Sequence, residues 1–319
     1  MARIVFGPVP SRRLGLSLGV DLFPEKYCTF DCVYCQVSRT RETEIARKTF
    51  VDTEEVVRQI VEALRGVPVV DFITFSGSGE PTLSNNLGEL LRRVRQTVPI
   101  PLAVITNGSL LHLKEVRDEL EAADVVLPSL DAAQEETFRR INRPHASLTL
   151  AGLVEGLKAF RLEFKGKIWL ELMLLRNINN SAQELKLFKQ IITSIGADKV
   201  QLNTVTRPPR DASVEGLGTL ELEKIRRYFG GSCEVIGLFE GRLPLPEGQD
   251  WQTAVEAILK RRSLSLKEIA GMTGLSPSFT RKGLQVLEGK GRVRPLLFRG
   301  RLFYVYGQSP TNSVDKSGP

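Results

Sequence analysis

The chain has 319 residues, of which 42% are hydrophobic and 25% are charged, an ordinary composition for a globular protein. This length is enough for one barrel-sized domain with a small appended module, or for two medium domains. The sequence contains no run of about 18 apolar residues and does not begin with a secretory leader. We therefore expect a cytoplasmic protein that does not cross a membrane.

Six short apolar runs of the β type alternate with amphipathic helical patterns between about residues 15 and 240. The runs are Leu16–Phe23, Val69–Ser76, Leu102–Asn107, Val125–Ser129, Ile168–Leu175 and Val200–Val205. Between them, Asp52–Leu64 and Ser181–Ile195 have helical spacing, with Ser181 and Glu184 placed as a capping box and Gly196 placed to end the second helix. Six such repeats predict an α/β fold, either doubly wound or curled into a partial (β/α)6 TIM-like barrel.

A composition shift marks the end of this main domain, which we place at residues 1–242. Two prolines and a glycine in residues 243–250 predict a linker. Helices follow at Trp251–Lys260, Ser265–Met272 and Pro277–Gly289, and then a β-ribbon at Arg292–Val305. This order predicts a small C-terminal winged helix-turn-helix domain at 251–308, with a disordered tail at 309–319.

The predicted winged domain holds most of the excess positive charge. It has eleven Lys and Arg against three Glu, a net charge of +8, while the whole chain has +7. Such asymmetry favours a polyanion or an acidic protein as the partner of this domain.

Three of the four cysteines lie within eight residues, in the sequence CTFDCVYC. The spacing of Cys28, Cys32 and Cys35 is typical of a metal or cluster site rather than of a disulfide framework. Zinc stays an alternative, although it commonly uses paired Cys-x2-Cys halves with four ligands. A [4Fe–4S] cluster on three cysteines leaves one iron open for a cosubstrate. Cys233 stands alone and is predicted to be a buried small hydrophobe near a strand.

Polar residues follow one predicted strand after another. SGSGEPT follows the second strand, Asn107 the third, and Ser129 and Asp131 the fourth. Because the carboxyl ends of parallel strands meet at one edge, we expect a shared site there. Residues after or within the last two strands would line its substrate end, or be solvated loop residues: Arg176, Asn177, Gln201, Asn203 and Arg207.

The cysteine loop, with Tyr34 directly before its third cysteine, resembles the radical S-adenosylmethionine (SAM) superfamily. The resemblance implies a [4Fe–4S] cluster on Cys28, Cys32 and Cys35 whose open iron binds the amino and carboxylate groups of SAM. Reductive cleavage of SAM would give a 5′-deoxyadenosyl radical that abstracts hydrogen from a substrate, with the electron supplied by a donor of the flavodoxin or ferredoxin type. The implied SAM-binding residues are Tyr34 at the adenine, Gly77, Ser78, Gly79 and Glu80 at the amino group, and Ser129 and Asp131 at the ribose or carboxylate. Ser129 and Asp131 are equally consistent with helix caps, and Asn107 with a turn.

A narrower resemblance covers the N-terminus. The sequence GPVPSRRLG at residues 7–15, together with INRPH at 141–145, is similar to radical SAM oxidoreductases grouped with the wyosine synthetases that modify tRNA. Wyosine-forming relatives carry a second cysteine-ligated cluster, for which this chain has no cysteine triad, so we expect a related but different substrate. Arg12 and Arg13 would bind a substrate phosphate or carboxylate, or be surface charge.

Three functions stay open. The first is a radical SAM enzyme acting on RNA, with basic residues of the winged domain, such as Arg281 and Arg299, on its phosphates. The second is modification of a protein or peptide, with the winged domain as docking module. The third is an Fe–S redox-sensing regulator that binds DNA; it is disfavoured because a sensor needs neither six β/α units nor the glycine-rich loop.

Overall fold

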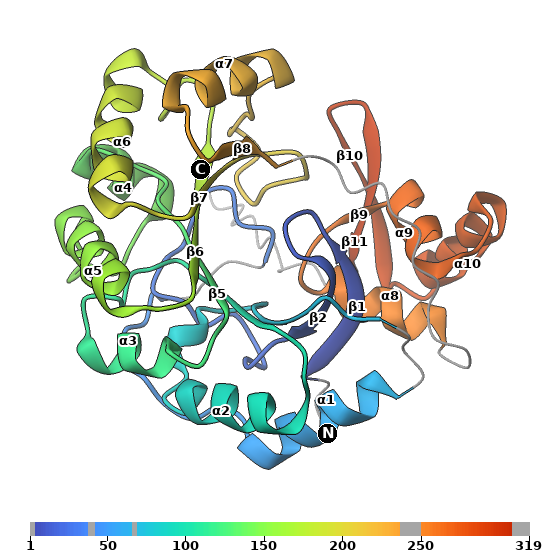
Figure 1. Ribbon diagram of the computed structural model, residues 1–319. Helices are drawn as coiled ribbons and strands as arrows, with labels where there is room; N and C mark the ends of the chain where they lie inside the picture. Colours follow the sequence, from blue (N-terminus) through green and yellow to red (C-terminus); the bar gives the residue numbers. More distant parts are fainter. Residues whose placement is uncertain (1–3, 38–41, 66–68, 237–249, 308–319) are drawn as a thin grey trace, which may run out of the picture.

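The computed structural model describes residues 4–37, 42–65, 69–236 and 250–307 (Figure 1). Its centre is an eight-stranded sheet in the order β1 to β8, in which β2 to β8 are parallel and β1 is antiparallel to β2. The strands are β1 (Val5–Ser11), β2 (Gly15–Val20), β3 (Phe72–Phe75), β4 (Leu102–Thr106), β5 (Val125–Pro128), β6 (Lys167–Leu174), β7 (Lys199–Thr204) and β8 (Cys233–Val235). In the described residues β8 does not pair with β1, so the sheet is a partial barrel.

All six predicted strands are present, as β2 to β7, and two further strands flank them. β1 was not expected because it contains Pro8 and Pro10, which lower strand propensity. Its position at the sheet edge tolerates the missing N–H groups. Cys233 begins β8 and is only 6% exposed, which confirms the prediction of a buried residue near a strand.

Helices cover the outside of the curved sheet (Figure 1). They are α1 (Thr53–Leu64), η1 (Pro81–Leu83), α2 (Leu87–Thr97), α3 (Lys114–Leu120), α4 (Glu135–Asn142), α5 (Leu150–Glu163), α6 (Ala182–Ile195) and α7 (Thr219–Phe229). Ser181 caps α6 and Gly196 ends it in a left-handed conformation, as predicted. Glu184 does not complete the capping box, because its carboxylate accepts from the Ala133 N–H at 2.7 Å. The side chain thereby ties α6 to the loop after β5.

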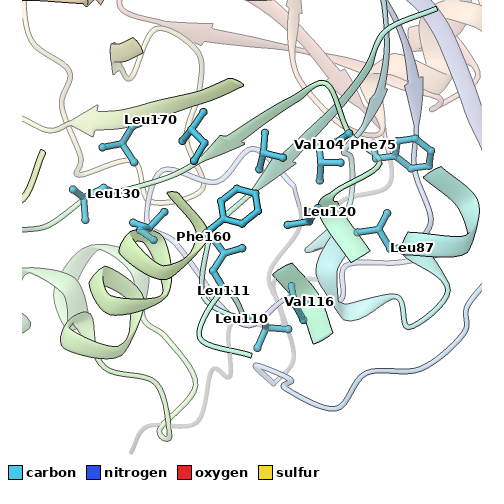
Figure 2. Close-up of a cluster of buried hydrophobic side chains, with 14 of the residues drawn as sticks. Phe75, Leu87, Val104, Leu110, Leu111, Val116, Leu120, Leu130, Phe160 and Leu170 are labelled. Carbon is cyan, nitrogen blue, oxygen red and sulfur yellow. The ribbon is translucent and has the colours of Figure 1, made fainter. Parts of the chain in front are cut away.

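The core lies between the outer face of the sheet and the helices. Figure 2 shows Val104 and Leu170 from the strands packed with Leu120 and Phe160 from the helices, and all four side chains are fully buried. Burial of each such side chain contributes about 1.5–3 kcal/mol. This layer holds the strands in register and so fixes where their carboxyl ends lie.

Residues 250–307, here called the C-terminal module, follow the barrel. The module contains α8 (Trp251–Leu259), β9 (Leu264–Ser265), α9 (Leu266–Thr273), α10 (Pro277–Gly289), β10 (Val293–Phe298) and β11 (Arg301–Tyr306). Its strands form a separate sheet in the order β10-β11-β9. The predicted linker, apart from residue 250, and the predicted tail lie outside the described residues.

The module shares its hydrophobic core with the barrel. Phe6 and Val9 of β1 belong to the same buried cluster as Val255 and Ile258 of α8 and Leu264 of β9. The edge strand β1 therefore carries the module on its outer side. No helix among the described residues is long and apolar enough to span a bilayer.

Candidate active site

The cysteine loop follows β2 and is held from two sides. The Asp31 N–H donates to the carbonyl of Asn142 at 2.9 Å, and the Arg210 N–H donates to the carbonyl of Cys35 at 2.9 Å. The Arg210 guanidinium also pairs with the carboxylate of Asp31. Contacts from the end of α4 and from the loop after β7 thus fix residues 28–35 at the carboxyl end of the sheet.

Amide groups point at two of the three sulfurs. Asn107 Nδ2 lies 3.6 Å from Cys28 Sγ, and Asn142 Nδ2 lies 3.5 Å from Cys32 Sγ. Such donors stabilise negative charge on sulfur and are a known influence on Fe–S clusters. The sequence indicated Asn142 only as part of the INRPH segment and predicted no contact between this residue and a cysteine.

The surroundings of two of these thiols favour the neutral form. Burial, followed by the neighbouring Glu80, raises the pKa of Cys28 to about 12. Burial and then Asp131 raise the pKa of Cys32 well above its usual range. Thiolates in this setting need a positively charged centre beside them, which a metal cluster supplies.

The number of thiols in the loop bears on which metal group fits it. Structural zinc sites commonly use four tetrahedral ligands, whereas a [4Fe–4S] cluster held by three cysteines leaves one iron open. Cys28, Cys32 and Cys35 supply three thiols in one loop, and Cys233 lies apart from them in β8.

Glu80 joins the turn after β3 to the end of β4. Its buried carboxylate accepts from Thr106 Oγ1 at 2.6 Å, from the Asn107 N–H at 2.7 Å and from the Thr82 N–H at 3.1 Å. Burial raises the pKa of Glu80 in spite of these donors. Because Asn107 also reaches Cys28, this contact brings the glycine-rich turn and the cysteine loop together.

The glycines of this turn are required by close packing. A Cβ at Gly77, where φ is 154°, would lie 2.3 Å from the Asp21 carboxylate, and one at Gly79 would lie 2.3 Å from the Tyr27 carbonyl oxygen. Ser78 donates to Asp21 through its N–H at 3.0 Å and its hydroxyl at 2.7 Å. Asp21 thus organises the turn, a role the sequence did not reveal.

Asp131 is the centre of a second buried network. It accepts from the Tyr34 hydroxyl, from Asn142 Nδ2 at 2.7 Å and from the Met173 N–H at 3.1 Å. Burial raises its pKa. The network sets the positions of Tyr34 and Asn142 beside the cysteine loop, whereas the Ser129 side chain has no hydrogen-bond partner in the described part of the chain.

The suggested substrate-end residues separate into two groups. Gln201 and Asn203 are buried in β7, and Asn203 Nδ2 donates at 3.0 Å to Glu171, which pairs with Arg13. This polar set joins neighbouring strands, as expected for a barrel lining.

The remaining residues of that prediction lie elsewhere. Arg176 donates to the carboxylate of Glu221 at 3.0 Å, and Asn177 lies in a turn with a φ of 58°. These features are typical of loop residues. Arg207 pairs with Glu268 of the C-terminal module.

The hairpin of the module reaches the same end of the barrel. Phe298, at the end of β10, packs in one hydrophobic cluster with Val33, Tyr34, Met173 and Val205. The expected wing is therefore docked beside the cysteine loop instead of projecting freely.

A three-cysteine loop at the carboxyl end of a partial β/α barrel is typical of a radical SAM enzyme. A family model described as the radical SAM superfamily matches residues 24–188, more than half of the chain, and the chain belongs to that superfamily. Its members are enzymes that bind a [4Fe–4S] cluster and SAM and take an electron from an external reductant.

Within this superfamily the chain is similar to a UPF0026 protein of Methanocaldococcus jannaschii. The two are 32% identical over 311 residues, which is 95% of each chain. The chain is also 42% identical over 231 residues to a protein named GTPase Obg of Brachyspira hyodysenteriae. That match covers 72% of this chain and 34% of the Brachyspira protein, so the chain spans about a third of that relative.

A solved structure confirms the fold. The radical SAM methyltransferase from Sphaerobacter thermophilus superposes with a TM-score of 0.51 at 17% identity, over 69% of this chain and 65% of that one.

Proposed function

We propose that the chain holds one [4Fe–4S] cluster on Cys28, Cys32 and Cys35 and uses it with SAM to modify RNA. The observation that carries the cluster assignment is the set of closely spaced thiols, two of which face amide donors and have pKa values raised by burial. When bound, the cluster supplies the electron that cleaves SAM to a 5′-deoxyadenosyl radical, which takes hydrogen from the substrate. We propose a flavodoxin or ferredoxin as the donor of that electron.

The chain's own residues would bind and orient SAM. The glycine-rich turn from Gly77 to Glu80 would offer backbone carbonyls to the SAM amino group, with the buried carboxylate of Glu80 assisting through its negative charge. Tyr34 would lie against the adenine, held by Asp131, while Ser129 has a hydroxyl free to reach the ribose or carboxylate. In this proposal Asp131 acts mainly by positioning Tyr34, because three donors within the chain already occupy it.

RNA is the favoured substrate because of the charge and position of the module. The order of helix, strand, two helices and hairpin supports a winged helix, and its segment carries a net charge of +8. Phe298 and Tyr34 pack against the same buried cluster, so a polyanion held by the module would be presented near the barrel mouth. The N-terminal likeness to wyosine-related enzymes supports tRNA, and the missing second cysteine triad argues against the tricyclic base itself.

Modification of a protein or peptide is the second candidate. Phe279 and Val286 on α10 are 55% and 50% exposed, which favours a protein partner over a duplex on that face.

SAM cleavage under anaerobic conditions tests this proposal. Reconstituted protein with dithionite should convert SAM to 5′-deoxyadenosine, and Cys32→Ala should not. Mass spectrometry of tRNA and peptide pools, with and without the enzyme, then identifies the substrate. A mass change confined to peptides would replace the RNA assignment, and absent SAM cleavage with an intact cluster would favour the redox regulator.

A further inference from the structure

A pocket of about 1130 Å³ lies between the barrel rim and the C-terminal module. Three arginines from different parts of the chain line it: Arg12 after β1, Arg207 after β7 and Arg262 after α8. Apolar side chains, including Met272 and Leu275, form part of its wall. The pocket therefore combines a cationic end with room for an apolar body.

The positive charge in this pocket is incompletely neutralised. Among the described residues that line it, Glu268 is the single acidic side chain, and it pairs with Arg207. Arg262 donates only to the Pro10 carbonyl, at 3.5 Å, among the described residues. The Arg12 guanidinium has no hydrogen bond or ion pair with any described residue.

The neighbouring Arg13 provides a comparison within the same turn. Arg13 points to Glu171 of β6 and forms an ion pair with it. Arg12 forms no ion pair among the described residues and lines the pocket, where Glu268 is a more distant neighbour. Burial lowers the pKa of Arg12 and of Arg13 to about 10 each, so the two arginines differ in their ion pairing and not in their pKa values. Burial, followed by Arg207, lowers the pKa of Arg262 to about 9, while Glu268 opposes this shift.

Further groups around the pocket favour an anion. Ser276 and Pro277, at the N-terminus of the 13-residue helix α10, line it and add the positive end of the helix dipole. Lys267 and Arg301 supply two exposed cations at its edge. One guanidinium group can donate two parallel hydrogen bonds to two oxygens of the same phosphate. Several arginines beside a helix N-terminus are therefore well suited to bind phosphate.

We propose that this pocket binds phosphate groups of a ligand whose apolar or planar body lies against its apolar wall. A nucleotide has this chemistry, either free or as part of an RNA chain. The identification of the ligand as part of an RNA substrate rests on the RNA function proposed above. The existence of the phosphate site does not depend on that function.

Binding to the full chain without reductant tests the site. Isothermal titration calorimetry would use inorganic pyrophosphate, a nucleoside monophosphate and tRNA as separate probes. Arg12→Gln removes a cation that has no hydrogen bond or ion pair among the described residues, and Arg301→Gln removes an exposed cation at the edge of the pocket. Arg92→Gln is the matched control, because Arg92 is exposed on α2 of the barrel and does not line the pocket.

The proposal expects wild type to bind pyrophosphate and the nucleotide, and Arg12→Gln to weaken both by roughly tenfold, the usual cost of one charged hydrogen bond. Arg301→Gln should weaken them less, and Arg92→Gln should leave them unchanged. No binding of small phosphates by wild type, or equal loss in Arg92→Gln and Arg12→Gln, would overturn the site. If wild type binds pyrophosphate and the nucleotide but not tRNA, the phosphate site stands and RNA is rejected as its ligand. SAM cleavage measured on the same samples tests the catalytic proposal separately.

Discussion

The Arg261 guanidinium of the C-terminal module donates through Nε to the carboxylate of Asp21, at the end of β2, over 2.6 Å. Asp21 is 3% exposed, and the same carboxylate holds the N–H and hydroxyl of Ser78. The Arg261 guanidinium also lies 4.3 Å from the centre of the Phe6 ring on β1. One buried anion therefore joins the module to the turn that we assign to SAM.

Arg261→Gln should weaken both the module contact and SAM binding. The substitution leaves a buried carboxylate without its cation, a change that costs about 3 kcal/mol in comparable buried pairs. Chemical unfolding would measure this loss, and equilibrium dialysis with SAM would measure affinity. The exposed Arg294→Gln is the control. Lower stability with unchanged SAM affinity would show that Asp21 supports only the module.

Cys32→Ala should abolish the brown absorbance of the reconstituted cluster and the production of 5′-deoxyadenosine. Cys233→Ala should retain both, because Cys233 lies in β8 at the far end of the sheet order from β1, and should lose no more than about 1 kcal/mol of stability. Iron and sulfide analysis beside the absorbance spectrum checks the result. Tetrahedral zinc bound at the loop in place of iron would contradict the cluster assignment.

Local sequence predicted the elements better than the contacts between them. The strands β2 to β7 and the helix α10 could be predicted because burial of one face of an element repeats apolar residues at a short, regular spacing along the chain. The edge strand β1 was hidden by its two prolines. Asp21 and Arg261 are 240 residues apart, and nothing in the spacing of either residue predicts that they meet.

The same limit applies within the site. The cysteine spacing and the glycine-rich turn are local patterns, so they could be found from the sequence. Their connection through Asn107, and the contact of Asn142 with Cys32, depend on how strand ends are arranged in the folded barrel. The docked position of Phe298 likewise follows from the shared core of β1 and the module.

Glu80→Gln should lower SAM affinity by about tenfold while the cluster stays bound, since the substitution removes the charge proposed to receive the SAM amino group. The new amide also places a donor near the Asn107 N–H, where the carboxylate accepts at 2.7 Å, and this mismatch should cost about 1–3 kcal/mol of stability. SAM titration and chemical unfolding of the same preparations separate the two effects. With the exposed Glu121→Gln as control, normal SAM affinity in Glu80→Gln would reject the assigned role.

Asn142→Ala should make the reduction potential of the cluster more negative. Asn142 Nδ2 lies 3.5 Å from Cys32 Sγ, and an N–H directed at a cluster sulfur stabilises the reduced, more negative state. The substitution also removes the 2.7 Å donor to Asp131, so Tyr34→Phe, which disturbs Asp131 without removing the amide, is needed beside it. Potentiometric titration followed by electron paramagnetic resonance measures the shift in samples with full cluster absorbance. The exposed Asn85→Ala should keep the wild-type potential. A shift in Tyr34→Phe as large as that in Asn142→Ala would assign the effect to Asp131, and an unchanged potential in Asn142→Ala would show that the amide does not act on the sulfur.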